Sequence, residues 1–227
     1  ILLDAQQRQL ARFTASHQID EGAGAADIAA ERLEFGPQLQ PYEITERARG
    51  LVENVNGPIR ANARIAWTKE TITGVGTVRL DGVSLATATM PIVNNVRGEV
   101  AFDDLFLLTT PPGQEISVGE LNPGISVTNG VVRFQLLTES RVAIENARFD
   151  FASGILTMTP TTISLGADET QFELNLRDVD ATDLLQTLNV PDLTATGRVE
   201  GHFPLLLTRR SAFIQDGVLR AQGEGGR

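Results

Sequence analysis

RVAIENARFDFASGILTMTPTTISL, residues 141–165, is the stretch that decides the fold. Apolar and polar side chains alternate along it, as they do in a β-strand that has one buried face. The apolar side chains of its first half form two sets of opposite parity: Val142 and Ile144, then Ala147, Phe149 and Phe151. One extra residue at Glu145-Asn146, a β-bulge, would return both sets to the same face. The stretch therefore predicts a bulged strand, and Ala152-Ser153-Gly154 predicts the turn of a hairpin.

The hairpins between residues 142 and 176 predict one shared apolar surface, because side chains of equal parity point to the same face of a sheet. We expect eight side chains to form it: Val142, Ile144, Phe149, Phe151, Leu156, Met158, Leu174 and Leu176. An aliphatic surface of this kind suits either a closed core or contact with acyl chains. The residues alone leave both interpretations open.

The same alternation recurs along the chain in short runs bounded by Gly, Pro, Asn or Asp. Examples are IRANARIAW at 59–67 and QFELNLRDV at 171–179, and Asp81-Gly82 predicts a turn between two strands. These runs predict an all-β fold built on an antiparallel sheet. We expect a single unit over residues 1–227, in which strands and a helix within 1–57 precede the main sheet of 58–227.

Two stretches break the alternation and predict short helices. In residues 42–55, one helical stripe would contain Ile44, Ala48, Leu51, Val52 and Val55. Asn56-Gly57-Pro58 would then end this first helix. The second helix, near residues 181–188, would begin after Asp180 as its N-cap and end before Pro191.

Composition excludes several classes of function. The chain has 29 Asp and Glu against 19 Lys and Arg, and its net charge of −10 argues against nucleic acid as a partner. It has no cysteine, which excludes disulfides, thiolate metal sites and a cysteine nucleophile. Aromatic residues make up only 5% of the chain, too few to suggest stacking on bases or sugars.

Side chains suited to catalysis or metal binding are sparse. The two histidines, His17 and His202, are far apart in the sequence, and we interpret each as a partly exposed strand residue. Asp178, Asp180 and Asp183 are better explained by capping of the short helix than by a divalent cation. We therefore predict no catalytic residue, no metal ligand and no cofactor, and we do not expect an enzyme.

Five motifs carry a resemblance to a known family: TTPPGQ at 109–114, NPGI at 122–125, ARFDFASG at 147–154, PDLTATGRVEG at 191–201 and DGVLR at 216–220. With them, the chain from about Gly98 onward resembles the C-terminal region of the YdbH family. These are AsmA-like proteins of the Gram-negative envelope, some of whose domains carry an older dicarboxylate-transport label. Upstream, PYEITERARGLVENVNGPI at 41–59 is similar to a helix and strand of the same region.

The resemblance implies a long, curved sheet that forms an open apolar groove. It also implies a parent protein anchored in the inner membrane, which moves phospholipid across the periplasm to the outer membrane. A small outer-membrane lipoprotein would pair with the C-terminal end by strand addition. The exposed edge of residues 213–221 further predicts edge-to-edge self-association. The glycine-rich end, GEGGR at 223–227, suggests a piece of a longer protein, with any anchor outside it.

Two alternative functions remain open at the level of sequence. A carboxylate-binding module would need arginines that converge in a closed pocket, for which Arg133 and Arg141 are the best candidates. A structural β-scaffold without a ligand would instead have a tightly packed, dry core. The interior of the sheet distinguishes these possibilities from a lipid conduit.

Overall fold

The computed structural model describes residues 9–90, 92–122, 125–190, 192–209 and 211–223, together with the backbone of residues 2–3. Within these residues, fifteen strands form a single sheet. The strands are β1 (Leu2–Leu3), β2 (Gln9–Gln18), β3 (Ala23–Phe35), β4 (Glu53–Trp67), β5 (Ile72–Ala86), β6 (Ile92–Phe102), β7 (Gln114–Asn122), β8 (Val127–Leu137), β9 (Arg141–Phe151), β10 (Gly154–Met158), β11 (Thr161–Ser164), β12 (Glu169–Asp180), β13 (Arg198–Thr208), β14 (Ala212–Ile214) and β15 (Val218–Ala221).

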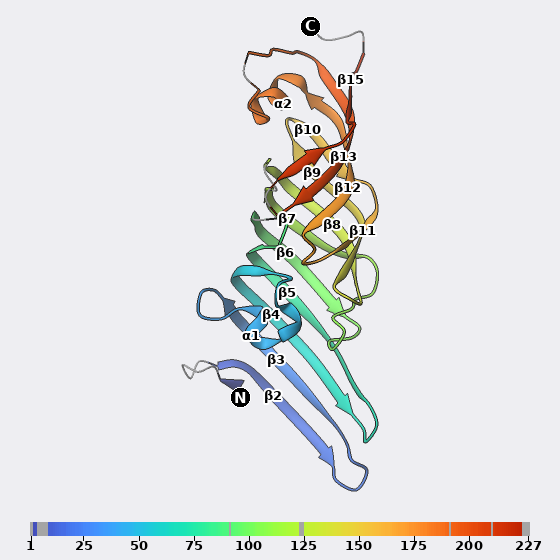
Figure 1. Ribbon diagram of the computed structural model, residues 1–227. Coiled ribbons are helices and arrows are strands. Elements are labelled where there is room, and N and C mark those ends of the chain that lie inside the picture. The colour runs from blue at the N-terminus through green and yellow to red at the C-terminus, as the bar shows by residue number, and fades with distance from the viewer. Residues whose placement is uncertain are drawn as a thin grey trace.

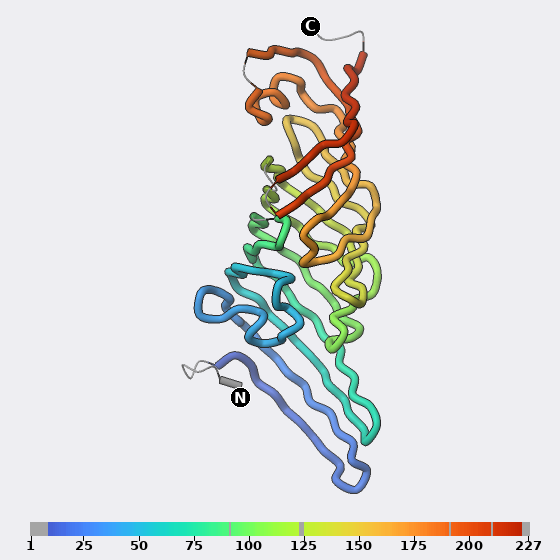
Figure 2. Tube along the Cα trace, viewed as in Figure 1, coloured from blue at the N-terminus to red at the C-terminus, as the bar shows by residue number. Residues whose placement is uncertain are grey.

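Neighbouring strands in the sheet are, with few exceptions, neighbours in the sequence, and every pair is antiparallel (Figure 1). The exceptions are β11, which pairs with β9, β12, which pairs with β10, and β15, which pairs with β13. The chain therefore advances strand by strand along one elongated, twisted sheet, with its termini at opposite ends (Figure 2). This architecture confirms the predicted all-β class. We call the face that carries the buried apolar clusters the inner face, β1–β5 the N-terminal half and β6–β15 the C-terminal half.

The predicted bulge is present in β9. Arg133 of β8 pairs with Asn146, and the next residue, Phe134, pairs with Ile144, so that Glu145 is the extra residue. Its carboxylate accepts a hydrogen bond from the Gly113 amide (2.8 Å) and forms an ion pair with Arg133, whose Nε lies 3.0 Å away. The bulge thus returns the apolar side chains to one face and also fixes the loop before β7.

The predicted hairpin follows directly. Phe151 pairs with Gly154 across a two-residue turn, in which Ala152 and Ser153 have φ angles of 44° and 57°. Two successive positive φ angles are typical of the type I′ turn, whose twist matches that of the strands. Both β10 and β11 pair with β9, so residues 154–164 extend along the length of that strand.

The turn predicted at Asp81-Gly82 is wrong, because β5 continues through it to Ala86. The register with β6 shifts between Asp81 and Val83, and Gly82 has a φ of +95°. Asp-Gly favours left-handed backbone, which serves a bulge as well as a hairpin turn. The Asp81 carboxylate binds Arg60 and Arg79 at 3.2 Å each, which holds the bulge in place.

The first predicted helix is much shorter than residues 42–55. Helix α1 (Pro41–Ile44) and the 3-10 turn η1 (Glu46–Ala48) are separated by Thr45, whose backbone is extended at φ −142° and ψ 123°. Gly50 then adopts a φ of +75°, and β4 begins at Glu53. The helix that the apolar stripe predicted is interrupted at two positions. The β-branched Thr45 has an extended backbone, and Gly50 has a left-handed one.

The predicted stop at Asn56-Gly57-Pro58 is also wrong, because it lies inside β4. Gln40 fixes the start of this strand. Its side chain accepts a hydrogen bond from the Val55 amide (3.0 Å) and donates to the carbonyl oxygens of Val55 (2.8 Å) and Gly36 (2.7 Å). These bonds mimic strand pairing and hold residues 36–52, which we call the covering segment, against the sheet.

The second predicted helix is confirmed as α2 (Ala181–Thr187). Asp180 caps it as expected, since its carboxylate accepts hydrogen bonds from the amides of Thr182 (2.9 Å) and Asp183 (3.1 Å). Ala181 and Leu184 are buried against the inner face of the sheet. Pro191, which we expected to follow the helix, lies outside the described residues.

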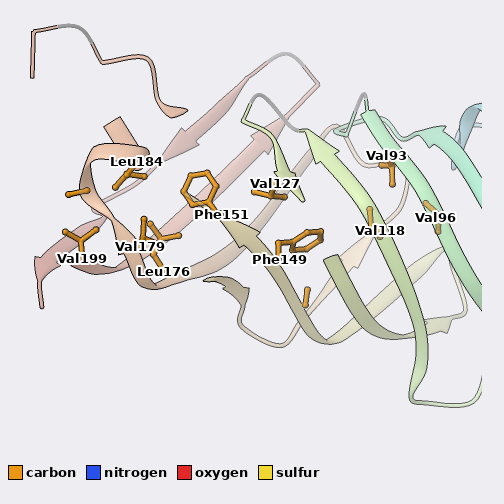
Figure 3. Packing of buried hydrophobic residues seen from close by; sticks show 12 residues of the cluster. Val93, Val96, Val118, Val127, Phe149, Phe151, Leu176, Val179, Leu184 and Val199 are labelled. Carbon is orange, nitrogen blue, oxygen red and sulfur yellow. The ribbon is translucent and has the colours of Figure 1, made fainter. Parts of the chain in front are cut away.

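The inner face carries three buried clusters. The N-terminal core consists of Ala11, Ala30, Leu33, Phe35, Leu39, Val55, Ile59 and Val83. The middle cluster consists of Val100, Phe134 and Val142. The C-terminal core, drawn in Figure 3, consists of Val93, Val96, Val118, Val127, Ala147, Phe149, Phe151, Leu176, Val179, Ala181, Leu184 and Val199.

Candidate functional site

An apolar cavity of about 220 Å³ lies on the inner face of the C-terminal half. Its walls come from strands β7–β10 and β12–β15, the loop before β6 and helix α2. All eighteen lining side chains are apolar: Met90, Leu121, Ile125, Val127, Phe149, Phe151, Leu156, Met158, Phe172, Leu174, Leu176, Leu184, Leu188, Phe203, Leu205, Ala212, Ile214 and Leu219. Such a surface offers no hydrogen bond to a ligand and favours hydrocarbon over water.

Six of the eight residues predicted from the sequence line this cavity: Phe149, Phe151, Leu156, Met158, Leu174 and Leu176. The strand register explains their common position. Leu156 pairs with Phe149 on one side and with Leu176 on the other, and Met158 pairs with Leu174 in the next row. Their part in holding acyl chains stays a prediction.

The other two predicted residues lie beside the cavity. Val142 is buried in the middle cluster, where it pairs with Leu136. Ile144 packs against both the middle cluster and the C-terminal core. The bulge at Glu145 thus places the two side chains on the expected face, but that part of the face is already filled.

The sequence argument missed the half of the wall that faces β9 and β10. Phe203 of β13 pairs with Leu174, and Leu205 of the same strand pairs with Phe172. Alternation along GRVEGHFPLLL at 197–207 gives Val199, Phe203 and Leu205 one parity, and this signal was present in the sequence. Leu184 and Leu188 come from α2 and its C-terminal end, for which strand parity carries no information.

The cavity opens to solvent near the C-terminal end of the sheet. Three of its lining residues are partly in water there: Leu188 is 39% exposed, Ile214 54% and Leu219 48%. Exposed apolar side chains gathered at the mouth of a cavity are typical of a site that receives an apolar ligand or partner.

Beside the cavity, a polar latch links Glu120 of β7 to Ser126, which precedes β8, and to Asn94 of β6. The Glu120 carboxylate accepts hydrogen bonds from Ser126 Oγ (2.8 Å) and Asn94 Nδ2 (3.1 Å). The bond from Ser126 and, after it, that from Asn94 lower the pKa of the Glu120 carboxyl below its ordinary value. The latch flanks Leu121 and Ile125, which line the cavity, so it helps to fix that wall.

The candidate carboxylate-binding arginines do not converge on a pocket. Arg133 is bound to Glu145, and Arg141 Nη2 lies 3.7 Å from Glu139 Oε2. The histidines also have structural partners: His17 accepts a hydrogen bond from Trp67 Nε1 (3.2 Å), and His202 Nδ1 lies 3.0 Å from Asn175 Oδ1. His17 is exposed and His202 half-buried, as their strand positions predicted.

The acidic cluster near α2 has separate partners for each member. Asp180 caps the helix, Asp183 accepts a hydrogen bond from Ser153, and Asp178 lies 3.8 Å from Arg198 Nε. Across the part of the chain that the structure describes, no group of His, Asp and Glu has the arrangement of a metal site. In the same residues, no helix has the length and apolarity that spanning a membrane requires.

An antiparallel sheet with a hydrocarbon-lined cavity on its inner face, open at one end, has the architecture of proteins that bind apolar ligands in a β-sheet cavity. The family model described as YdbH-like, intermembrane phospholipid transport protein YdbH, matches residues 2–227, and the chain therefore belongs to this family. The match confirms the resemblance seen in the motifs. No curated protein and no solved structure matches the chain.

The family is one of intermembrane phospholipid transport and is associated with the Gram-negative envelope. Lipid transport proteins of this kind are not an enzyme class. Phospholipid is accordingly the ligand class that the family implies.

Proposed function

We propose that this chain is a segment of a periplasmic lipid conduit, whose inner face shields phospholipid acyl chains on their way between the inner and outer membranes. The observation that carries the proposal is the cavity lining, which is apolar throughout. The phospholipid headgroup, which finds no polar partner in such a lining, stays in solvent outside the mouth.

The size of the cavity fits part of one acyl chain. Its volume of about 220 Å³ exceeds that of the engineered apolar cavity of ~150 Å³ that stays dry and binds benzene. Burial of on the order of six CH₂ groups at ~0.8 kcal/mol each would lower the free energy of a chain outside the membrane by about 5 kcal/mol. A lipid would therefore cross this segment with its chain partly sheltered.

We extend the proposal to residues 1–227 as one unit, with 1–57 preceding the main sheet of 58–227. One sheet passes through both parts, since the division falls inside β4, and this supports a single unit. The parent protein would be anchored in the inner membrane of a Gram-negative bacterium.

The C-terminal edge would bind a partner by strand addition. Strands β14 and β15 each pair with β13 on one side, and no described residue pairs with their other side. A strand from a small outer-membrane lipoprotein, or from a second copy of this chain, would fit this edge.

Replacement of Leu219 by Pro removes a backbone donor from the edge, so we expect a lower oligomer fraction in light scattering with an unchanged circular dichroism spectrum. The matched control is Arg220→Ala, which changes a side chain of the same strand and keeps the backbone N–H of Leu219. Proline at Leu206 would not serve as a control, because Leu206 pairs with β12 on one side and with β14 on the other. A monomer at every concentration would rule out self-association.

The two alternatives receive less support. A carboxylate-binding module needs free, convergent arginines, whereas Arg133 and Arg141 already face carboxylates. A ligand-free scaffold needs a filled core, and the C-terminal half instead leaves a cavity.

Photo-crosslinking tests the proposed function. Leu174→Asp places a charge in the cavity wall and should abolish labelling by a phosphatidylethanolamine that carries a diazirine on its acyl chain. Arg148→Asp, on the opposite face of the sheet, should label like the wild type. Equal loss in both variants, or a wild-type protein that is not labelled and yields no lipid in its organic extract, would refute the conduit.

A further inference from the structure

Two phenylalanine rings of the cavity wall lie against glycines. A Cβ atom on Gly130 of β8 would be 2.1 Å from Phe149 Cε1 and 2.5 Å from Phe149 Cδ1. A Cβ on Gly217 would be 2.4 Å from Phe203 Cδ1. Carbon atoms do not approach so closely, so each ring occupies the space that any larger residue would need.

The backbone gives no other reason for these two glycines. Neither Gly130 nor Gly217 has a φ angle in the left-handed region, in contrast to Gly82 at +95°. An alanine is therefore compatible with the backbone at both positions, and only the missing Cβ distinguishes glycine there.

We infer that Gly130 and Gly217 are positioning residues that keep the cavity open by letting Phe149 and Phe203 lie flat against the sheet. This inference rests on the proposed function. Phe149 is only 3% exposed, and Figure 3 shows its ring between Val127 and Val118. A close-packed interior has no space for a displaced side chain. A ring displaced from Gly130 therefore moves into the adjoining free volume, which is the cavity.

Gly217 acts in the same way at the mouth. Its added Cβ would also lie 2.9 Å from Ile214 Cγ2, so the substitution displaces two lining side chains at once. Gly130 thus sets the width of the interior, and Gly217 sets the width of the entrance. Both determine which hydrocarbon enters without contributing an atom to its binding surface.

The test compares alanine variants of the full chain, with the acyl-diazirine phosphatidylethanolamine as the probe. Gly130→Ala and Gly217→Ala should each lower labelling about tenfold, the effect of moderate overpacking. Gly36→Ala is the matched control, because its Cβ would meet only Asn56 Nδ2, at 3.6 Å. It should label like the wild type.

A second substitution separates cavity width from stability. Gly130→Ala combined with Phe149→Leu replaces the displaced ring by a smaller side chain and should restore labelling to within about twofold of the wild type. If Gly130→Ala does not fold, Phe149→Leu alone decides, because a narrower side chain should increase labelling by a probe with a bulky pyrene-bearing acyl chain.

The inference is overturned if the alanine variants label normally, if Gly36→Ala loses as much labelling as they do, or if Phe149→Leu neither rescues labelling nor admits the bulky chain. Failure of the proposed function looks different: the wild-type protein itself would then remain unlabelled.

Discussion

The two halves of the sheet share one inner face but use it differently. In the N-terminal half, Leu33 and Phe35 of the face pack in one cluster with Leu39 of the covering segment, residues 36–52. In the C-terminal half, the wall residues leave a cavity of about 220 Å³, to which the short helix α2 and its C-cap contribute Leu184 and Leu188. Alternation thus builds an apolar wall in both halves, and the segment that crosses the wall decides whether it encloses a core or a ligand space.

The size of the side chains supports the same distinction. On the inner face of β3 and β4, Ala30 pairs with Ala61 and Ile28 with Ala63, so small side chains make up part of this wall. In the C-terminal half, four phenylalanines line the cavity: Phe149, Phe151, Phe172 and Phe203. Large side chains around the cavity keep it open only if their rings can lie flat against the sheet instead of filling the cavity.

The covering segment also reaches the C-terminal half. A Cβ on Gly166, in the turn between β11 and β12, would lie 3.0 Å from the Gly50 carbonyl oxygen and 3.6 Å from Leu51 Cδ2. The segment therefore extends from β3 and β4 to a turn more than a hundred residues further along the chain. This contact closes the inner face beside the middle cluster, where Val142 and Ile144 are packed.

The same Leu→Ala substitution should change the free energy of unfolding by different amounts in the two halves. The change in the N-terminal half is the largest effect that we expect. Leu33→Ala creates a new cavity in the filled N-terminal core and should lower the free energy of unfolding by about 2–5 kcal/mol. Leu174→Ala enlarges a cavity that already exists and should cost about 1–2 kcal/mol, close to the transfer term alone. Urea unfolding of both variants measures the difference, and equal costs would show that the two halves are packed alike.

Loss of the Gln40 side chain should loosen the covering segment. Gln40→Ala leaves the Val55 amide and the carbonyl oxygens of Val55 and Gly36 without their side-chain partner, and should destabilise the protein by about 1–3 kcal/mol. Gln38→Ala, an exposed neighbour, should have almost no effect. Hydrogen exchange should speed up at Val55 but not at Leu176, whereas uniform acceleration would contradict a local role.

The bulge and the part of the cavity wall formed by β9, β10 and β12 were predictable from the sequence because parity is a strict constraint. Val142 and Phe149 reach one face only if a single residue is inserted between them, and Glu145 is that residue. Asp180 was equally predictable, because a carboxylate before an apolar helical stretch satisfies free amides at the helix start. In each case a local rule admits one solution.

The remaining features depend on contacts that no local rule specifies. Asp81-Gly82 satisfies the rule for a turn and the rule for a bulge, and pairing with β6 decides between them. Parity gives the face of Leu205 and Leu219, but not that their strands curl around to meet Phe149 across a cavity. The apolar stripe of 44–55 satisfies a helical period, although Gln40 binds Val55 into a strand.

The smallest effect we expect concerns the latch at Glu120, which fixes one wall of the cavity and has no counterpart in the filled core. The hydrogen bonds from Ser126 and Asn94 lower the pKa of Glu120 in the folded state. The latch therefore contributes its full stability above the unfolded-state pKa of about 4.3, and it loses this contribution as the pH falls through the lower, folded-state pKa. Glu120→Gln keeps the acceptor oxygen but removes the charge, so the protection of the Leu121 and Ser126 amides from hydrogen exchange, taken relative to their intrinsic rates, should be lower at neutral pH and no longer fall on acidification. Glu115→Gln, on an exposed position of the same strand, should retain the wild-type dependence. If Glu120→Gln and the wild type respond to acid alike, the latch does not hold this wall.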